Sequence, residues 1–196
     1  MARSKPFLII IISLTLIIFP NCIKKPQVLQ YTLPHLPYPI AKERVLITVA
    51  GQGPEGLVVA KICDDLKISN TFSYKATIED LKDINSLLVA VGVSKVGMES
   101  IYTDFEQEKQ RIIRLVAKAN EQRIPIIMVY LGGSNRWDIL NQEMLSAVGN
   151  YANYIIAISS HKSEDFFHGI AMENTIPFTL VKDMERFYVP LNSAFR

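Results

Sequence analysis

The sequence predicts an α/β fold: a three-layer α/β/α sandwich around a mostly parallel sheet of five to six strands. Short apolar runs without polar alternation recur along the chain, as in strands that helices cover on both faces. Segments with helical spacing of apolar residues separate these runs. The 196 residues, 49% hydrophobic and 20% charged, suffice for one buried core and exclude a disordered chain.

Five runs rich in Val, Ile and Leu predict buried strands at residues 45–50, 87–91, 126–130, 154–158 and 178–181. A further segment, residues 71–76, alternates, with Phe72, Tyr74 and Ala76 on one face, which is typical of an edge strand. If this second strand lies at the edge, a flavodoxin-like order 2-1-3-4-5 fits better than the Rossmann-like order 3-2-1-4-5-6, in which it is interior.

Apolar residues at helical spacing predict the intervening helices, with a short one at residues 79–84. The others lie at residues 59–66, 100–123, 137–148, 167–171 and 184–195. Strands and helices that alternate in this way form parallel sheets with right-handed crossovers. Ligands in such sheets bind beyond the carboxyl ends of the strands, where the strand order reverses.

The first 22 residues predict a secretory signal. Arg3 and Lys5 form a basic start, and the 13 residues 7–19 are apolar apart from one serine and one threonine. As a helix this run reaches roughly 20 Å, short of the ~30 Å hydrocarbon core of a bilayer. The place of Cys22 just after it resembles a bacterial lipoprotein signal, in which the cysteine is lipidated. A retained N-terminal anchor and simple cleavage stay open as alternatives.

The chain therefore divides into a signal peptide with its lipidation cysteine (residues 1–22), a Pro-rich tether (residues 23–42) and a single α/β domain (residues 43–196). Four prolines favour extended chain in the tether; the alternative is an arm whose apolar residues pack on the domain. We expect an exported protein that the lipid on Cys22 anchors to the outer face of the cytoplasmic membrane or to the outer membrane.

Charge and cysteine content exclude several functions. The formal charge of +2 falls to zero once Arg3 and Lys5 leave with the signal, so no nucleic-acid partner is expected. Two cysteines cannot form a disulfide framework or a four-thiolate metal site. Cys63 lies in an apolar helical stripe, which predicts an inert buried thiol.

Residues 51–56 (GQGPEG) match the dinucleotide fingerprint G-x-G-x-x-G between a strand and a helix. Pro54 removes one N–H from the turn, and Glu55 places a carboxylate at the helix end where the phosphate would bind. The next strand end, residues 75–77, lacks the acid that binds the ribose. We therefore expect an ordinary helix start and no cofactor, although a small anion at this turn stays open.

Two catalytic or metal-binding patterns are weaker. Ser94 lies in a glycine-rich turn one residue too long for the G-x-S-x-G elbow, but it could act as a nucleophile with His161 as base and Asp138 as its orienting group. His161, Glu164 and His168 share one helical stripe, yet this spacing matches no zinc signature, and no metal is expected.

The loops after the first, third and fourth buried strands are expected to converge on a ligand. They carry Gln52, Gly53, Ser94, Lys95, Ser134, Asn135 and Arg136. In this hypothesis the amides and hydroxyls hydrogen-bond the ligand, the cations attract an anionic group, and the glycines admit its close approach. The leading prediction is a non-enzymatic, extracytoplasmic binding domain for a small polar or anionic ligand. The alternatives are a serine-type hydrolase using Ser94 and His161, and a structural or interaction protein of the cell envelope.

Five features of the sequence resemble an uncharacterised bacterial family of exported or lipid-anchored α/β domains, a domain of unknown function. They are VLITVAGQGPEGL (45–57), LLVAVGVSKVG (87–97), the long acidic-then-basic helix expected at residues 100–123, LGG (131–133) and IPFTLVK (176–182). The resemblance spans residues 44–195. It implies the fold and the exported location, and a serine in many members at the position of Gly53, but no activity.

Overall fold

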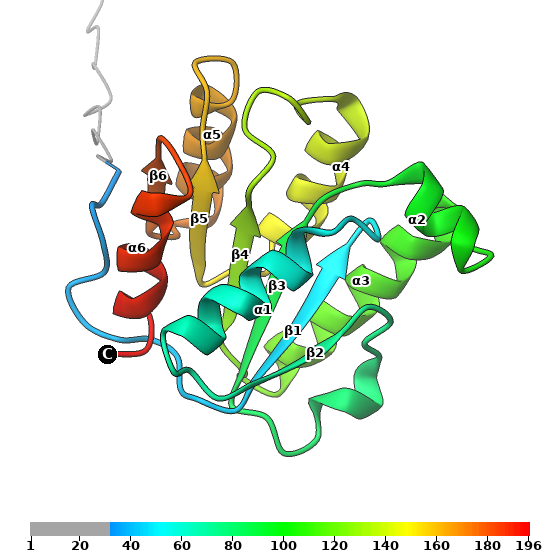
Figure 1. Ribbon diagram of the computed structural model, residues 1–196, viewed down its shortest axis with the longest axis horizontal. Coiled ribbons are helices and arrows are strands. Elements are labelled where there is room, and N and C mark those ends of the chain that lie inside the picture. Colours follow the sequence, from blue (N-terminus) through cyan, green and yellow to red (C-terminus); the bar gives the residue numbers. More distant parts are fainter. Residues whose placement is uncertain (1–31) are drawn as a thin grey trace, which may run out of the picture.

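The computed structural model describes residues 32–196. It contains a six-stranded, all-parallel sheet with the order β2-β1-β3-β4-β5-β6, covered by helices on both faces (Figure 1). The strands are β1 (Val45–Ala50), β2 (Asn70–Ser73), β3 (Ser86–Val91), β4 (Ile126–Tyr130), β5 (Tyr154–Ile158) and β6 (Phe178–Val181). The predicted three-layer fold and the flavodoxin-like position of the second strand at the edge are both confirmed.

Each central strand feeds two hydrophobic clusters, because successive side chains point to opposite faces of the sheet. Leu87 and Val89 of β3 face one cluster, while Leu88 and Ala90 face the other. The first cluster is covered by α3 (Phe105–Glu121), α4 (Ile139–Gly149) and α5 (Glu164–Asn174), and the second by α1 (Glu55–Asp65) and α6 (Tyr188–Ser193). Burial on both faces explains why these strands read as unbroken apolar runs.

The helix predicted at residues 100–123 begins only at Phe105, as α3, and a short helix that was not predicted, α2 (Lys95–Ser100), precedes it. The chain turns between them through Tyr102, whose φ is +57°. Asp104 then caps α3 by accepting a hydrogen bond from the Gln107 amide at 2.8 Å. The error arose because a cap of this kind restarts a helix without interrupting the apolar spacing.

The edge strand β2 is shorter than predicted. It pairs with β1 only as far as Thr48↔Ser73. The next carbonyl of β1 that faces β2, that of Val49, instead accepts a hydrogen bond from Arg111 at 2.7 Å. The strand ladder stops there, and the predicted helix at residues 79–84 is a single 3₁₀ turn, η1 (Ile78–Leu81); a second such turn, η2 (Glu185–Phe187), precedes α6.

Residues 32–42, the described part of the predicted tether, lie against the domain. Thr32 Oγ1 accepts a hydrogen bond from the Leu180 amide of β6 at 2.9 Å, and Leu36 is buried against α6. The predicted signal, Cys22 and residues 23–31 lie outside the described residues. Between residues 32 and 196, no helix combines the length and apolarity needed to cross a membrane.

Candidate functional site

Three loops follow the carboxyl ends of β1, β3 and β4: the first loop (residues 51–54, after β1), the third loop (92–94, after β3) and the fourth loop (131–138, after β4). The strand order reverses between β1 and β3. There the first and third loops are joined by main-chain hydrogen bonds, from Gly53 N to Gly92 O at 2.9 Å and from Ser94 N to Gly51 O at 2.7 Å. The sequence therefore placed these loops together correctly, but their backbones fill the gap between them.

Gln52 points away from the expected ligand. Its φ is +60°, a left-handed backbone conformation, and its side chain is directed inward. Nε2 donates to the carbonyl of Tyr74 at 3.0 Å and to Glu108 Oε1 at 3.1 Å, and the residue is 6% exposed. The amide of Gln52 is therefore engaged within the protein, and we no longer assign it to a ligand.

Beneath the first loop lies a buried ionic network that the sequence analysis missed. Glu108 of α3 accepts hydrogen bonds from Gly51 N at 3.0 Å and, through both carboxylate oxygens, from Arg111 at 2.8 Å each. Arg111 also donates to the carbonyls of Ala76 and Val49, at 2.7 Å each. Because both charged groups have several partners, this network fixes α3 to the ends of β1 and β2.

Glu55 and Arg136 form a second ion pair at these loops. We call these two residues, together with Gly53 and Gly92, the Glu55 cluster. Glu55 is the first residue of α1, and its Oε1 pairs with Arg136 Nη1 from the fourth loop. Its side chain is 8% exposed. A Cβ on either Gly53 or Gly92 would overlap Oε2, so both glycines are needed for the carboxylate to lie where it does. The helix N-terminus favours this negative charge.

One oxygen of this carboxylate remains chemically open. Glu55 Oε2 is buried and has no hydrogen-bond partner among residues 32–196. Buried polar atoms are nearly always hydrogen-bonded, and an unsatisfied one costs about 1–3 kcal/mol, more when charged. The Glu55 cluster can therefore accept one further hydrogen bond at Oε2.

Of the remaining predicted residues with side chains, one has a structural role and three are exposed. Ser94 caps α2, its Oγ accepting from the Gly97 amide at 3.1 Å. Lys95, Ser134 and Asn135 are exposed, and their side chains make no hydrogen bond or ion pair within the described part of the chain. Ser134 and Asn135 lie on the fourth loop directly before Arg136, and Lys95 is the first residue of α2.

Aromatic residues hold the fourth loop from below. Tyr130 at the end of β4 donates its hydroxyl to Gly133 O at 3.2 Å. Burial, with added effects of the nearby Asp138 and Glu55 carboxylates, raises the pKa of Tyr130. Its ring contacts Trp137 with centroids 5.9 Å apart, and Trp137 also packs edge-on against Phe166 at 5.1 Å. Trp137 is the only tryptophan of the chain and directly follows Arg136. Its fluorescence can therefore report on changes at the Glu55 cluster.

The structure does not bring together the residues of the catalytic and metal-binding alternatives. The side chain of His161 is fully exposed, its Nδ1 4.0 Å from Glu164, and no hydrogen bond joins it to Ser94 within residues 32–196. Both carboxylate oxygens of Asp138 accept from Asn141, at 2.9 Å each. In the same described range, no three His, Cys, Asp or Glu side chains are grouped closely enough to hold a metal ion.

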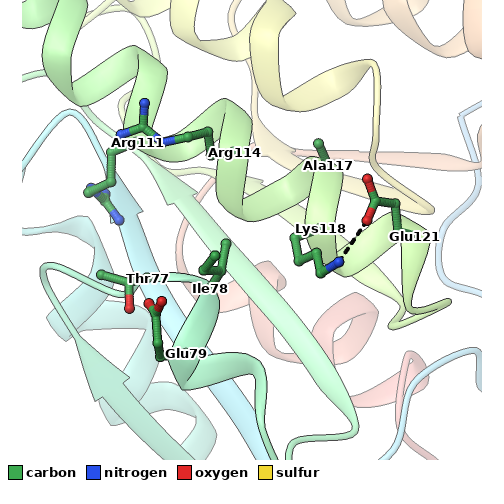
Figure 2. Close-up of a pocket in the computed structure, with 8 residues that line it drawn as sticks. All are labelled: Thr77, Ile78, Glu79, Arg111, Arg114, Ala117, Lys118 and Glu121. Atoms are coloured by element: carbon green, nitrogen blue, oxygen red, sulfur yellow. Dashed lines mark hydrogen bonds and ion pairs between the residues drawn. The ribbon is translucent and has the colours of Figure 1, made fainter.

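A cavity of about 580 Å³ lies elsewhere, between η1 and α3. In Figure 2, α3 lines one side with Arg111, Arg114 and Lys118, and the start of η1 faces it with Thr77 and Glu79. Its volume suits a small ligand, but its charges are largely matched. Arg111 is held by Glu108, and Lys118 pairs with Glu121 at 2.9 Å. The residues predicted to bind a ligand do not line this cavity, and no sequence pattern predicted it.

Comparison with known proteins gives one match. The family described as Domain of unknown function (DUF6305) matches residues 42–195, which include all six strands and the three loops. No curated protein and no solved structure matches the chain. The match agrees with the resemblance to a domain of unknown function, and it assigns no chemistry to the loops.

Proposed function

We propose a function from local geometry for this chain, which belongs to the family Domain of unknown function (DUF6305). The domain binds a small polar ligand at the carboxyl ends of β1, β3 and β4, without catalysing a reaction. The ligand contacts the Glu55 cluster and the exposed polar side chains of the fourth loop and of the start of α2.

The observation that carries this proposal is Glu55 Oε2, a buried carboxylate oxygen with no hydrogen-bond partner among the described residues. A carboxylate that served only to hold Arg136 could use both oxygens in a bidentate pair, as Glu108 does with Arg111. In the Glu55 cluster one oxygen is left over. A ligand N–H or O–H group would satisfy it.

The surroundings of Oε2 supply the other groups that a polar ligand needs. Arg136 is 34% exposed at its side chain and uses Nη1 on Glu55, so its other N–H groups can face a ligand. Ser134 and Asn135, which directly precede Arg136, carry an exposed hydroxyl and an exposed amide, and Lys95 at the start of α2 carries an exposed ammonium. Ser94 caps a helix, and His161 makes no contact with Ser94. These two residues therefore do not form a nucleophile and its base, and binding is favoured over hydrolysis.

The proposal includes an extracytoplasmic location. Residues 1–22 support it through their basic start, their short apolar run and Cys22. Residues 32–42 pack on the domain. A lipid on Cys22 would therefore hold the domain next to the membrane. The ligand would then be a solute of the cell envelope.

Thermal unfolding of the full chain in mild detergent tests the binding. The probes are amino acids, hydroxy acids, carboxylates, phosphate and polyols, each added separately. A ligand at about 100 times its Kd stabilises by ~2.7 kcal/mol, a rise of roughly 5–10 °C in Tm for a domain of this size. We expect at least one probe to give such a rise in the wild type and in Glu99→Gln, an exposed acid on α2, but not in Glu55→Gln. Equal shifts in all three proteins, or no shift with any probe, would refute the proposal.

A further inference from the structure

We infer that the ligand is a small zwitterion of the amino-acid type, with its ammonium group directed inward to Glu55 and its carboxylate directed outward to Arg136. This inference rests on the proposed function and specifies the chemical class of the ligand. It follows from the kind of group that each side of the Glu55 cluster can satisfy.

The inner end of the cluster requires a small hydrogen-bond donor. An ionised carboxylate only accepts hydrogen bonds, and Glu55 Oε2 has no donor among residues 32–196. Gly53 and Gly92 flank the oxygen so closely that neither position can carry a Cβ. A primary ammonium is compact and makes short, charge-assisted hydrogen bonds to a carboxylate.

The outer end presents donors and positive charge. Arg136 uses Nη1 on Glu55, which leaves its other N–H groups for a second partner. Ser134 and Asn135 directly precede it, and Lys95 lies three positions after Gly92; all three are exposed. A guanidinium fork whose chain neighbours carry a hydroxyl and an amide matches a carboxylate.

The charges of the site select against ligands with one sign of charge. The charges of Glu55 and Arg136 cancel. A purely cationic ligand would meet the guanidinium of Arg136. A purely anionic one would meet Glu55 and offer Oε2 no donor. A zwitterion places each of its charges beside one of opposite sign.

Access to Oε2 requires the Arg136 side chain and its loop to shift, because Glu55 is 8% exposed at its side chain. The loop is packed loosely at Gly133, where φ is +53° and a Cβ would meet only Ile158, at 3.7 Å, and tightly at Gly132, where a Cβ would lie 2.7 Å from the Tyr130 hydroxyl. Trp137 closes the loop on Tyr130 and Phe166. Binding should therefore change the fluorescence of Trp137.

Matched triplets test the class of ligand: each common amino acid, its amide, which lacks the carboxylate charge, and its des-amino acid, which lacks the ammonium. Binding to the full chain in mild detergent is measured by calorimetry and by Trp137 fluorescence. We expect at least one amino acid to bind, and its amide and des-amino acid to bind at least about tenfold more weakly, as loss of a hydrogen bond to a charged group implies. Glu55→Gln and Arg136→Met should each weaken that amino acid by a similar factor, and Glu99→Gln should not.

The other outcomes separate this inference from the proposed function. If an amide, a des-amino acid or a compound outside the triplets binds best and Glu55→Gln weakens it, the zwitterion is wrong and the proposed site stands. If the best ligand binds Glu55→Gln as tightly as wild type, both are wrong. Both also fail if no probe binds the wild type.

Discussion

Glu108 and Arg111 face each other on one turn of α3 in a bidentate pair, with Oε1 2.8 Å from Nη2 and Oε2 2.8 Å from Nε. Their side chains are 1% and 15% exposed. The pair lies under the first loop, where Glu108 holds Gly51 and Gln52 and Arg111 holds the carbonyls after β2 and within β1. The position of the first loop, and with it the start of α1 at Glu55, therefore depends on a charge pair more than fifty residues away in the sequence.

Arg111→Met should strongly destabilise the domain. It leaves the buried Glu108 carboxylate without its main cation and two carbonyls without a donor, and breaking a buried pair costs about 3–5 kcal/mol. Urea denaturation measures the free energy of unfolding. Lys118→Met, which removes an exposed pair on the same helix, is the control, at about 1 kcal/mol or less. Similar losses in the two variants would contradict the structural role of Arg111.

Gly92→Ala should destabilise the wild type more than it destabilises Glu55→Ala. The new methyl group overlaps only the Glu55 carboxylate among the atoms nearest to it, so it must displace that side chain, at about 1–3 kcal/mol. When Glu55 is absent, the cost should largely vanish. A double-mutant cycle by denaturation measures the coupling. Gly169→Ala, on α5 with open space around its Cβ, is the control and should be neutral or slightly stabilising. An additive cycle would place the carboxylate elsewhere.

Cys63 should resist alkylation in the folded protein. Burial raises the pKa of its thiol to about 12, so almost no thiolate exists at about pH 8. A Cys22→Ala chain, whose single thiol is Cys63, should take up iodoacetamide only after denaturation, as mass spectrometry would show. Rapid labelling of the native chain would show that Cys63 is accessible.

The same thiol should make stability fall at high pH. The folded form holds its proton up to a pKa of about 12, whereas the ordinary thiol loses it from 9.0. A raised folded-state pKa contributes stability below the unfolded value and loses it as pH rises through this window. Cys63→Ala should therefore flatten the decline of the unfolding free energy between pH 9.0 and 12. An unchanged slope would mean that other groups, such as Tyr154, dominate this range.

Labelled palmitate should enter the protein at Cys22 in a bacterial host, because a cysteine directly after a short apolar run is the acceptor in lipoprotein signals. Cys22→Ala should abolish the label, and Cys63→Ala, which removes the other thiol of the chain, should retain it. Gel fluorography of the immunoprecipitated protein measures both. A label that persists in Cys22→Ala would rule out lipidation at this residue.

The sequence by itself determined the layers of this protein and which loops meet. Strands buried on both faces must be apolar throughout, so β1, β3, β4 and β5 could be read from local composition. The alternation in residues 71–76 gave the edge position of β2, and the rule for parallel sheets then placed the first, third and fourth loops at one edge. The sequence also contained an indication of the buried ionic network. Glu108 lies four residues before Ile112 on the buried stripe of α3, where a charge needs a partner.

Only the tertiary structure decided what the loop side chains do. Gln52 was predicted to face a ligand, but its positive φ turns it inward to Glu108. Glu55 was read as an obstacle to phosphate, and it proves to be the centre of the candidate site, held by Arg136 eighty-one positions away. Burial follows from the period of neighbouring residues, which the sequence displays directly. The partner of a charged side chain is set by distances across the fold, and no local pattern contains them.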